Sequence, residues 1–207
     1  MASSGAALWR DGSPGTSQNR FSDFPDFGIA RARRRGESGP MKVGILSDTH
    51  NHLRETRKAL DALVQNGAQH LVHCGDVGED VVDLISATCL EHGIEAHIAI
   101  GNCDRRPGEE AGFSPQPPKI VRAHAPAFVL AGKTCLAMHG DRPHPLGQAL
   151  ASGTFDYVFT GHTHAPADEH VGSTRLLNPG SAARSRLGPP SVALLDLATD
   201  EVAWLLL

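Results

Sequence analysis

The chain has 207 residues, 40% of them hydrophobic and 20% charged, and a formal net charge of −4 at pH 7. That length suffices for one domain with its own core, and the sequence has no apolar run of about 18 residues with which to span a membrane. The negative charge provides no clear nucleic-acid surface, because phosphate backbones are bound mainly by basic residues. The four cysteines form no C-x-x-C pair and follow no secretory signal, which favours a reducing cytoplasm.

Residues 1–40 differ from the rest of the chain. They contain six Ser, six Gly and six Arg without apolar periodicity, and they end at Gly39-Pro40. We predict that they form a disordered tail or a non-native N-terminal extension, with Met41 as the natural start. The arginine cluster at 31–35 suggests a twin-arginine export signal, but no apolar segment follows it. We therefore expect one folded domain at 41–207.

From Met41 onward the chain alternates strands and helices. An apolar run at 42–47 predicts a buried strand, and leucines at helical spacing predict a helix over 53–66 that ends near Gly67. A strand at 70–74, a helix at 79–90 and a strand at 95–100 are expected next. This βαβαβ order predicts a mostly parallel sheet with helical crossovers.

The second half of the chain, after a proline-rich loop at 107–118, is richer in strands. We predict one helix near 144–152 and strands near 119–124, 127–131, 133–138, 156–160, 168–171, 174–177, 191–197 and 201–206. Hairpin turns are expected at Gly132-Lys133 and at Thr199-Asp200.

Side chains that ligate metals follow five of the predicted strands. The segments are Asp48-Thr-His50, Gly75-Asp76, Gly101-Asn102-Cys103-Asp104, His139-Gly140 and Gly161-His162-Thr163-His164. Carboxylate oxygens and neutral imidazoles suit divalent cations, and strand ends hold such groups at one edge of a parallel sheet. The combination predicts a metal site with seven ligands: Asp48, His50, Asp76, Asn102, His139, His162 and His164.

The spacing within these segments refines the prediction. In an extended segment the side chains at i and i+2 lie on the same side, so we expect Asp48 and His50 to converge on one ion. The same argument applies to His162 and His164. Asp76 lies centrally and could bridge two cations about 3.5–4 Å apart, an arrangement that clamps a phosphoryl group.

The ordered series D-x-H, G-D, G-N-x-D, H-G and G-H-x-H resembles the calcineurin-like metallophosphoesterase superfamily, and the resemblance covers Met41 to Leu207. The short chain, the Gly101-Asn-Cys-Asp104 motif and the segment Leu177-Asn-Pro-Gly-Ser181 are similar to the small YfcE-like phosphodiesterases. The resemblance implies an α/β protein with a four-layer α/β/β/α sandwich. It also implies a metal-dependent phosphoesterase that acts on a small phosphoester. A phosphodiesterase is the expected class, and the choice between monoester and diester stays open.

The same resemblance implies how the ligands divide between two ions. One ion would be held by Asp48, His50, Asp76 and His164, and the other by Asp76, Asn102, His139 and His162. Manganese is the expected metal, with iron, zinc, nickel or cobalt as alternatives, because oxygen and nitrogen ligands alone do not select among them. The expected catalytic residues are Asp76, Asn102 and His139.

The residue after the motif asparagine departs from the family pattern. Many members of the superfamily carry a histidine there that can protonate the leaving oxygen, whereas this chain has Cys103. A thiol with an ordinary pKa of about 8.5 is a poorer proton donor at neutral pH than imidazolium. The identity of the general acid is therefore open, and Asp104, with no histidine beside it, has a doubtful orienting role and could simply cap a turn.

Substrate contacts are less clearly specified. Asn102, Ser181 and Arg184 are the candidates, because the turn at 178–181 could present N–H groups to a phosphate, with Arg184 as its charge partner. Three further histidines either contact the substrate, support the site or lie on the surface: His52, His73 and His144.

Other functions are compatible with the same motifs. A non-catalytic interaction scaffold of this fold, like the retromer subunit, would not need all seven metal-competent side chains that this chain retains. A hydrolase of amides or thioesters could use the same ions, but nothing in the sequence favours it. A homo-oligomer is also compatible with the sequence.

Overall fold

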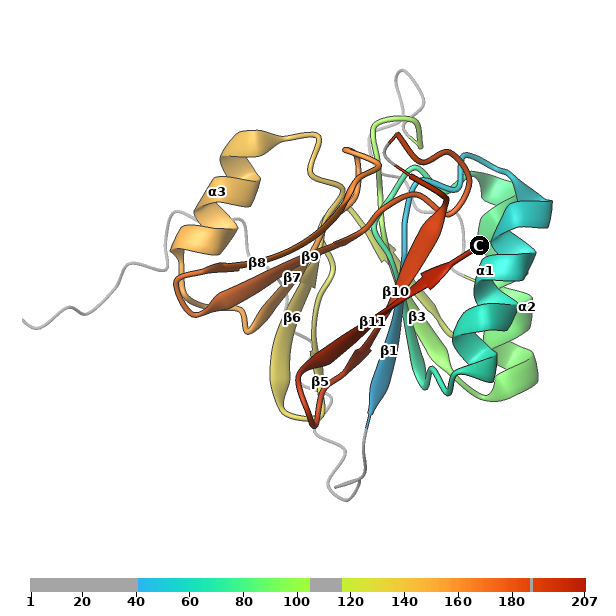
Figure 1. Ribbon diagram of the computed structural model, residues 1–207, viewed down its shortest axis with the longest axis horizontal. Helices are drawn as coiled ribbons and strands as arrows, with labels where there is room; N and C mark the ends of the chain where they lie inside the picture. The colour runs from blue at the N-terminus through green and yellow to red at the C-terminus, as the bar shows by residue number, and fades with distance from the viewer. Residues whose placement is uncertain (1–40, 105–116, 187) are drawn as a thin grey trace, which may run out of the picture.

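The computed structural model describes residues 41–104, 117–186 and 188–207. Residues 1–40 and most of the loop at 107–118 lie outside this range. Two sheets face each other, and helices cover their outer faces (Figure 1). Helices α1 (Leu53–Gln65) and α2 (Glu79–His92) lie outside the first sheet, and α3 (Pro143–Ala151) lies outside the second. The predicted four-layer α/β/β/α sandwich is confirmed.

The first sheet has the strand order β11-β10-β1-β2-β3-β4. Its strands are β1 (Lys42–Leu46), β2 (His70–His73), β3 (Glu95–Ala99), β4 (Ile120–Ala123), β10 (Ser191–Asp196) and β11 (Glu201–Leu206). Strands β1 to β4 run parallel, which confirms the predicted βαβαβ unit. The two C-terminal strands extend this sheet beyond β1 in antiparallel pairing.

The second sheet has the strand order β5-β6-β7-β9-β8. Its strands are β5 (Ala127–Leu130), β6 (Lys133–Ala137), β7 (Tyr157–Phe159), β8 (Pro166–Val171) and β9 (Thr174–Pro179). The inner strands β6, β7 and β9 are parallel, and β5 and β8 pair antiparallel at the edges. Both predicted hairpins are present, one between β5 and β6 and one between β10 and β11.

Strand β9 is longer than predicted. Asn178 and Pro179, which we placed in a turn, pair with Ala167 and Pro166 of β8. A proline lacks an N–H and favours an extended conformation in the residue before it, so it suits the last position of a strand. The turn therefore begins at Gly180, whose φ is 81°.

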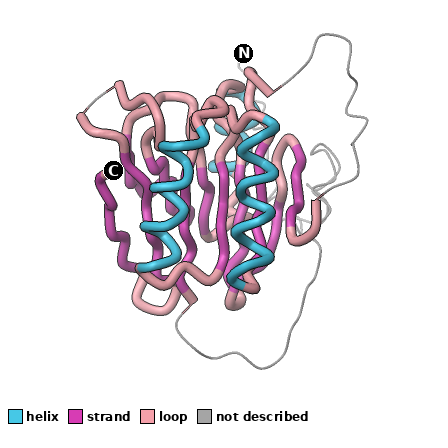
Figure 2. The backbone as a smooth tube through the Cα atoms, turned by 90° about the vertical axis from the view of Figure 1, so that its right-hand side faces the viewer, coloured by secondary structure: helices cyan, strands magenta, loops and turns pink. Residues whose placement is uncertain are grey.

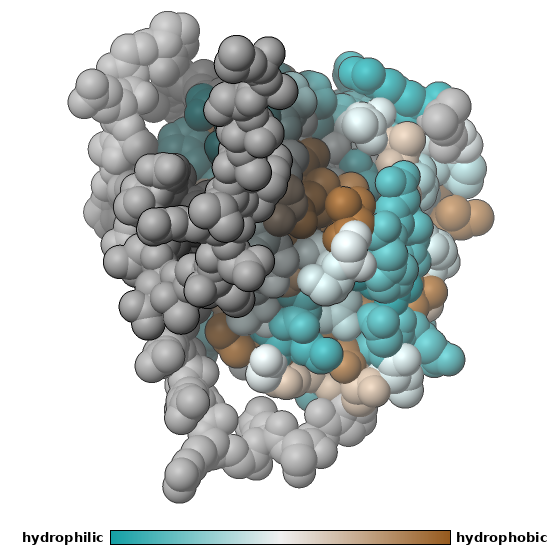
Figure 3. Space-filling model, turned by 90° about the vertical axis from the view of Figure 1, so that its left-hand side faces the viewer, coloured by the Kyte–Doolittle hydropathy of each residue, from teal (hydrophilic) through white to brown (hydrophobic). Residues whose placement is uncertain are grey.

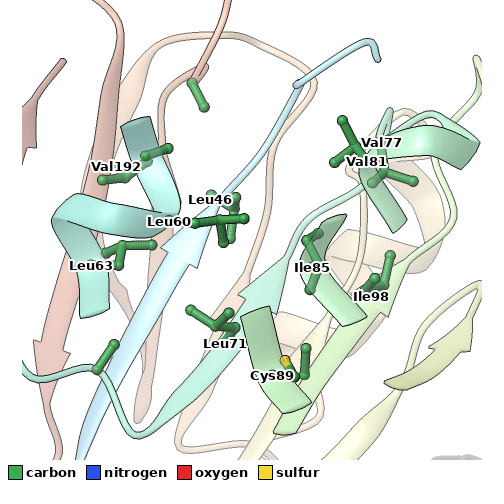
Figure 4. Close-up of a cluster of buried hydrophobic side chains, with 14 of the residues drawn as sticks. Leu46, Leu60, Leu63, Leu71, Val77, Val81, Ile85, Cys89, Ile98 and Val192 are labelled. Atoms are coloured by element: carbon green, nitrogen blue, oxygen red, sulfur yellow. The ribbon is translucent and has the colours of Figure 1, made fainter. Parts of the chain in front are cut away.

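The buried apolar side chains form a separate cluster at each contact between neighbouring layers. One cluster of apolar side chains packs between the first sheet and helices α1 and α2 (Figure 4). A second cluster lies between the two sheets, and a third lies beneath α3. In β1, Leu46 belongs to the first cluster and Ile45 to the second, because successive side chains point to opposite faces. Burial on both faces explains why this strand is a continuous apolar run in the sequence.

The helices form the two outer layers of the molecule. Helices α1 and α2 lie side by side across the first sheet (Figure 2), and α2 ends at Gly93, whose left-handed φ of 68° suits a glycine cap. On the α3 side of the molecule, hydrophilic and hydrophobic residues are mixed across the described surface (Figure 3). Among the described residues, no helix is both long and apolar enough to cross a bilayer.

Candidate metal centre

The predicted ligand segments gather at one end of the two sheets. Asp48, Asp76 and Asn102 follow the carboxyl ends of β1, β2 and β3, which are parallel neighbours. His139 follows β6, and the segment 162–164 follows β7, which is parallel to β6 in the second sheet. Since parallel strands end at the same edge of a sheet, both sheets contribute to one site.

One cluster contains Asp48, His50 and His164. The buried Asp48 carboxylate accepts hydrogen bonds at Oδ2 from Ser47 Oγ (2.6 Å) and from the His162 N–H (3.0 Å). Its Oδ1 lies 3.2 Å from His164 Nε2 and 4.0 Å from His50 Nε2. The two Nε2 atoms are 3.4 Å apart. Three ligand atoms from two distant segments therefore converge.

A second cluster surrounds Asp76. Its Oδ2 lies 3.3 Å from His139 Nε2 and 3.9 Å from His50 Nε2, so this carboxylate stands between the two clusters. His139 Nε2 is also 3.1 Å from Asn102 Oδ1. Asp76 Oδ1 accepts the Cys103 N–H at 2.8 Å, which fixes the orientation of the carboxylate.

His162 lies at the rim of the site. Its ring centroid is 5.0 Å from that of His139, with the rings at 75°. Its side chain is exposed, and in the described part of the chain it is absent from the groups of acidic, histidine and cysteine ligand atoms that lie within 4.8 Å of one another. The structure thus brings the other six predicted ligands into contact and leaves His162 beside them.

Left-handed backbone conformations, rather than extended segments, produce this clustering. Asp48 and His50 have φ of 54° and 44°, so our expectation of an extended D-x-H segment is wrong. His162 and His164 are left-handed too, at 66° and 59°, but His164 joins the Asp48 cluster, whereas His162 lies beside the His139 ring. Residues other than glycine rarely adopt this conformation, and those that do are concentrated at functional sites.

The hydrogen-bond pattern fits bound cations. His139 Nδ1 lies 2.8 Å from the Cys74 carbonyl and His164 Nδ1 lies 2.5 Å from the Arg184 carbonyl, so each Nδ1 carries a proton. In the neutral ring, each Nε2 then turns a lone pair toward carboxylate oxygens that also carry lone pairs. Within the described residues, Asp48 Oδ1 is buried without a hydrogen-bond partner. A divalent cation would satisfy all of these atoms.

Two glycines allow the backbone to approach the ligands closely. A Cβ at Gly101 would collide with Asp76 Oδ1 and with the Asp76 backbone nitrogen. A Cβ at Gly161 would collide with Ser47 Oγ and lie 2.8 Å from Asp48 Oδ2. Any larger residue at either position would therefore displace a ligand carboxylate.

Electrostatic effects keep Asp76 ionised. Burial by itself would raise the pKa of its carboxyl, but His139 and the Cys103 N–H outweigh burial and lower that pKa below its usual range. For His50, burial is the largest influence and lowers the pKa of the imidazole. For His139, contacts with Asp76 and the Cys74 carbonyl outweigh burial and raise the pKa. A proton therefore competes with a cation for His139 Nε2.

Cys103 presents its thiol to the site. The residue is exposed, and Asn102 Nδ2 lies 3.3 Å from its Sγ. Partial burial and the Asp76 carboxylate raise the pKa of this thiol to about 11. The thiol is therefore a weaker acid than an ordinary cysteine.

Asp104 connects two loops of the site. Its Oδ1 accepts the N–H groups of Val77 (2.8 Å) and Gly78 (3.1 Å), and its Oδ2 accepts the Gly101 N–H (2.8 Å). The carboxylate thus joins the loop after β3 to the loop after β2. These contacts give Asp104 a structural role.

A pocket of about 430 Å³ opens over the two clusters, within the size range of small-molecule sites. Its lining residues are His50, His52, Asp76, Asn102, Cys103, His162, His164, Arg184 and Arg186.

Three candidates from the sequence lie away from this pocket. Ser181 is fully buried, and its Oγ donates to the Asp48 carbonyl (2.9 Å) and accepts two backbone N–H groups. It supports the site and is not accessible to a substrate, contrary to our expectation. His73 is buried against Thr49, whose Oγ1 lies 2.9 Å from its Nε2. His144 is exposed on α3 and does not line the pocket.

Arg186 lines the pocket but was missed in the sequence. The sequence feature that could have identified it is its position two residues after Arg184, in the segment that follows the turn. In the turn itself, the Gly180 N–H donates to Asn178 Oδ1 at 3.0 Å and is not available to a phosphate.

The fold and the ligand residues together define a known class of protein. The calcineurin-like phosphoesterase superfamily domain matches residues 41–200, and the chain belongs to this superfamily. Phosphodiesterase MJ0936 of Methanocaldococcus jannaschii is 31% identical over 167 residues, which cover 78% of this chain and 96% of that protein. Phosphodiesterase YfcE of Escherichia coli is 30% identical over 169 residues, covering 75% and 88% respectively. The resemblance to the YfcE-like family is confirmed.

Solved structures share the same architecture. An archaeal phosphodiesterase aligns with a TM-score of 0.68 and 26% identity, over 81% of this chain and 100% of that chain. Vacuolar protein sorting 29 of Cryptosporidium parvum aligns with a TM-score of 0.57 and 20% identity, over 81% and 97%, and this likeness concerns the fold alone. Because one fold serves different functions, the site must decide the function.

Proposed function

We propose that this protein hydrolyses phosphodiesters with two divalent metal ions. The observation that carries the proposal is the pair of ligand clusters that share Asp76 at the strand ends. Membership of the superfamily supports phosphoester hydrolysis, and the names of the MJ0936 and YfcE relatives support diesters as the substrates.

Each proposed ion has its own set of ligands. One set is Asp48, His50, Asp76 and His164, and the other is Asp76, Asn102, His139 and His162. We propose manganese as the metal, with iron, zinc, nickel and cobalt as alternatives that favour similar ligands. Bound cations would polarise a water molecule and neutralise charge on the phosphoryl oxygens. Four cysteines without disulfides suit a reducing compartment, and we propose the cytoplasm.

The chain's own side chains would orient the substrate. Asn102 lies at the pocket with an amide that can donate to a phosphoryl oxygen, and Arg184 lines the same pocket, where it can bind negative charge elsewhere on the substrate. Hydrogen bonds already hold the Asp48 and Asp76 carboxylates, so little reorganisation accompanies the reaction. With its raised pKa, the Cys103 thiol is a weak proton donor, so the site favours esters whose leaving groups need little protonation.

The alternative is a non-catalytic, metal-binding scaffold of the same fold. A scaffold has no need of an open pocket of about 430 Å³ over the ligands, nor of arginines that face it. Both features favour the enzyme.

A metal-titrated assay tests the proposal. Activity would be measured on p-nitrophenyl phosphate, bis-p-nitrophenyl phosphate and cyclic nucleotides with each of the five metals. We expect activity with manganese and a preference for the diester. Asp76→Asn and His139→Ala should each lower kcat/KM at least about a hundredfold, because even residues that only support metal ligands contribute 10–100-fold.

The matched control is His92→Ala, which removes an exposed histidine at the end of α2 outside the pocket. It should retain wild-type activity and metal content. A wild-type protein that is inert with every metal, or Asp76 and His139 variants with full activity, would contradict the proposal.

A further inference from the structure

We propose that Arg184 and Arg186 bind a second anionic group of the substrate, beside the phosphate that reacts. This inference rests on the proposed function and narrows its substrate class to organic phosphodiesters that carry a further negative charge, as a phosphate or carboxylate.

The two arginines face the pocket with their charges unpaired. Both line the pocket that contains His50, Asp76 and His164, and both are exposed. Across the described ranges, neither guanidinium has a hydrogen-bond or ion-pair partner. Unpaired guanidinium groups beside a metal site can bind an anion without breaking an existing contact.

Two other arginines of the same protein show the contrast. Arg122 forms an ion pair with Glu79 at 2.9 Å, and Arg175 contacts Asp168 at 2.7 Å. Those guanidinium groups are engaged in contacts within the protein. Among the described residues, the two pocket arginines share the lack of such a contact with the exposed Arg57, and they differ from it in lining the pocket.

The backbone that carries the arginines is attached to the metal ligands. The Arg184 carbonyl accepts a hydrogen bond from His164 Nδ1 at 2.5 Å, and the Arg184 N–H donates to Ser181 Oγ at 2.8 Å. Ser181 Oγ donates in turn to the Asp48 carbonyl at 2.9 Å. The Arg186 N–H lies 3.5 Å from the His164 carbonyl. Both guanidinium groups therefore start from backbone positions that are fixed relative to the ligand clusters.

The sum of the charges in the site indicates which chemical group these side chains would bind. Two divalent cations bring four positive charges, and Asp48, Asp76, Asp104 and a singly charged diester offset all four. The two guanidinium groups add positive charge that a simple diester leaves unbalanced. A second phosphate or carboxylate would balance it, and guanidinium groups form paired hydrogen bonds that match both groups.

A pair of substrates that differ only in the second group tests the inference. They are thymidine 5′-(p-nitrophenyl phosphate) and the same compound with a 3′-phosphate. The manganese-loaded enzyme is expected to have a KM roughly tenfold lower for the 3′-phosphorylated substrate, the effect of one or two charge-assisted hydrogen bonds. In the double variant Arg184→Gln, Arg186→Gln the ratio of the two KM values should approach one.

Two controls separate specific contacts from general charge. Arg57→Gln removes an exposed positive charge on α1 outside the pocket and should keep the wild-type ratio. The double variant Arg184→Lys, Arg186→Lys should recover part of the ratio. Equal KM values in the wild type, or an equal loss of kcat/KM for both substrates in the glutamine variant, would overturn the inference.

Binding provides a readout that does not depend on turnover. Calorimetry would compare thymidine 3′,5′-bisphosphate with thymidine 5′-phosphate on the manganese-titrated protein. If the wild type binds the bisphosphate more tightly and the glutamine variant does not, the role of the arginines is supported. This holds even if neither ester is hydrolysed and the proposed function fails. Equal affinity overturns the inference, even where hydrolysis is observed.

Discussion

Asp48, His50, Asp76, His162 and His164 all have a left-handed backbone conformation, which costs a non-glycine residue roughly 1–3 kcal/mol. Hydrogen bonds between the loops after β1 and β2 hold two of them in place. The Asp48 N–H donates to the Gly75 carbonyl at 3.1 Å and the His50 N–H to the Asp76 carbonyl at 2.9 Å. The strain is concentrated where ligand geometry matters, which is typical of a functional site rather than of a stabilising turn.

We propose that Cys103 determines which leaving groups the site can accept. The pKa of its thiol is raised to about 11, whereas an imidazolium with a pKa of about 6.5 donates a proton more readily at neutral pH. We expect Cys103→His to raise kcat/KM roughly a hundredfold on esters with poor leaving groups and much less on p-nitrophenyl esters. The measurement is the slope of log kcat/KM against leaving-group pKa for a series of phenyl phosphodiesters.

Cys103→Ser is the matched control, because a hydroxyl is no better a donor than the thiol. It should retain the steep slope of the wild type. The same slope in the histidine variant would show that position 103 does not reach the leaving oxygen.

Strands β2 and β3 carry a histidine pair between the two sheets, in which His70 is buried and His97 is half-buried. His70 Nε2 lies 2.8 Å from His97 Nδ1, and His97 stacks on Phe128 of β5 with a centroid distance of 3.9 Å. Burial is the main cause of lowered pKa values, to about 3 for His70 and about 4 for His97. Both imidazoles are therefore neutral in the folded protein at physiological pH.

This pair should make stability depend on pH. Both folded-state pKa values lie below the unfolded value of about 6.5, so the unfolded chain binds more protons as the pH falls. The contribution of the two neutral imidazoles to the free energy of unfolding is fully present above pH 6.5. It is lost as the pH falls from 6.5 to about 3, by up to about 1.4 kcal/mol per pH unit for each histidine. Urea unfolding at pH 7, 5.5 and 4.5 in the presence of EDTA measures the loss.

His70→Gln isolates the contribution of the pair, because glutamine keeps a hydrogen-bonding group beside His97 without titrating. The variant should lose less stability than the wild type between pH 7 and 4.5. Equal losses in both proteins would assign the acid sensitivity to other groups.

The elements themselves were largely predictable. Helices α1 and α2 and the parallel strands β1 to β3 agree with the apolar periodicity, since that pattern reflects burial in both cases. The strand ends were less predictable, because pairing with a neighbour sets them. Pro179 belongs to β9 only because it lies opposite Pro166 of β8.

Met41 is attached to the fold through its carbonyl, which accepts the Leu197 N–H at 2.9 Å beside β10. The superfamily match begins at residue 41. We propose that the domain comprises residues 41–207 and that residues 1–40 are dispensable for folding and for metal binding.

Deletion of residues 1–40 tests this boundary. We expect Tm to change by less than about 2 °C, because a loss of about 1 kcal/mol would shift it by 2–4 °C in a domain of this size. Metal content and activity should be unchanged. A chain that begins at Ser47 lacks the central strand β1 and is the control that should fail to fold. A large loss of Tm in the first chain would place essential residues before Met41.

Local patterns in the amino-acid sequence were enough to identify the family, the order of the elements and the residues that can ligate metals. Motif spacing and apolar periodicity are properties of neighbouring residues, so Asp48 and Asp76 are recognisable without a structure. Packing of the two sheets decided the rest: which ligands share a cluster, why Ser181 is buried and how Arg186 reaches the pocket. His50 and His164 are 114 positions apart, and only left-handed turns at the strand ends, together with the meeting of two sheets, bring their Nε2 atoms within 3.4 Å.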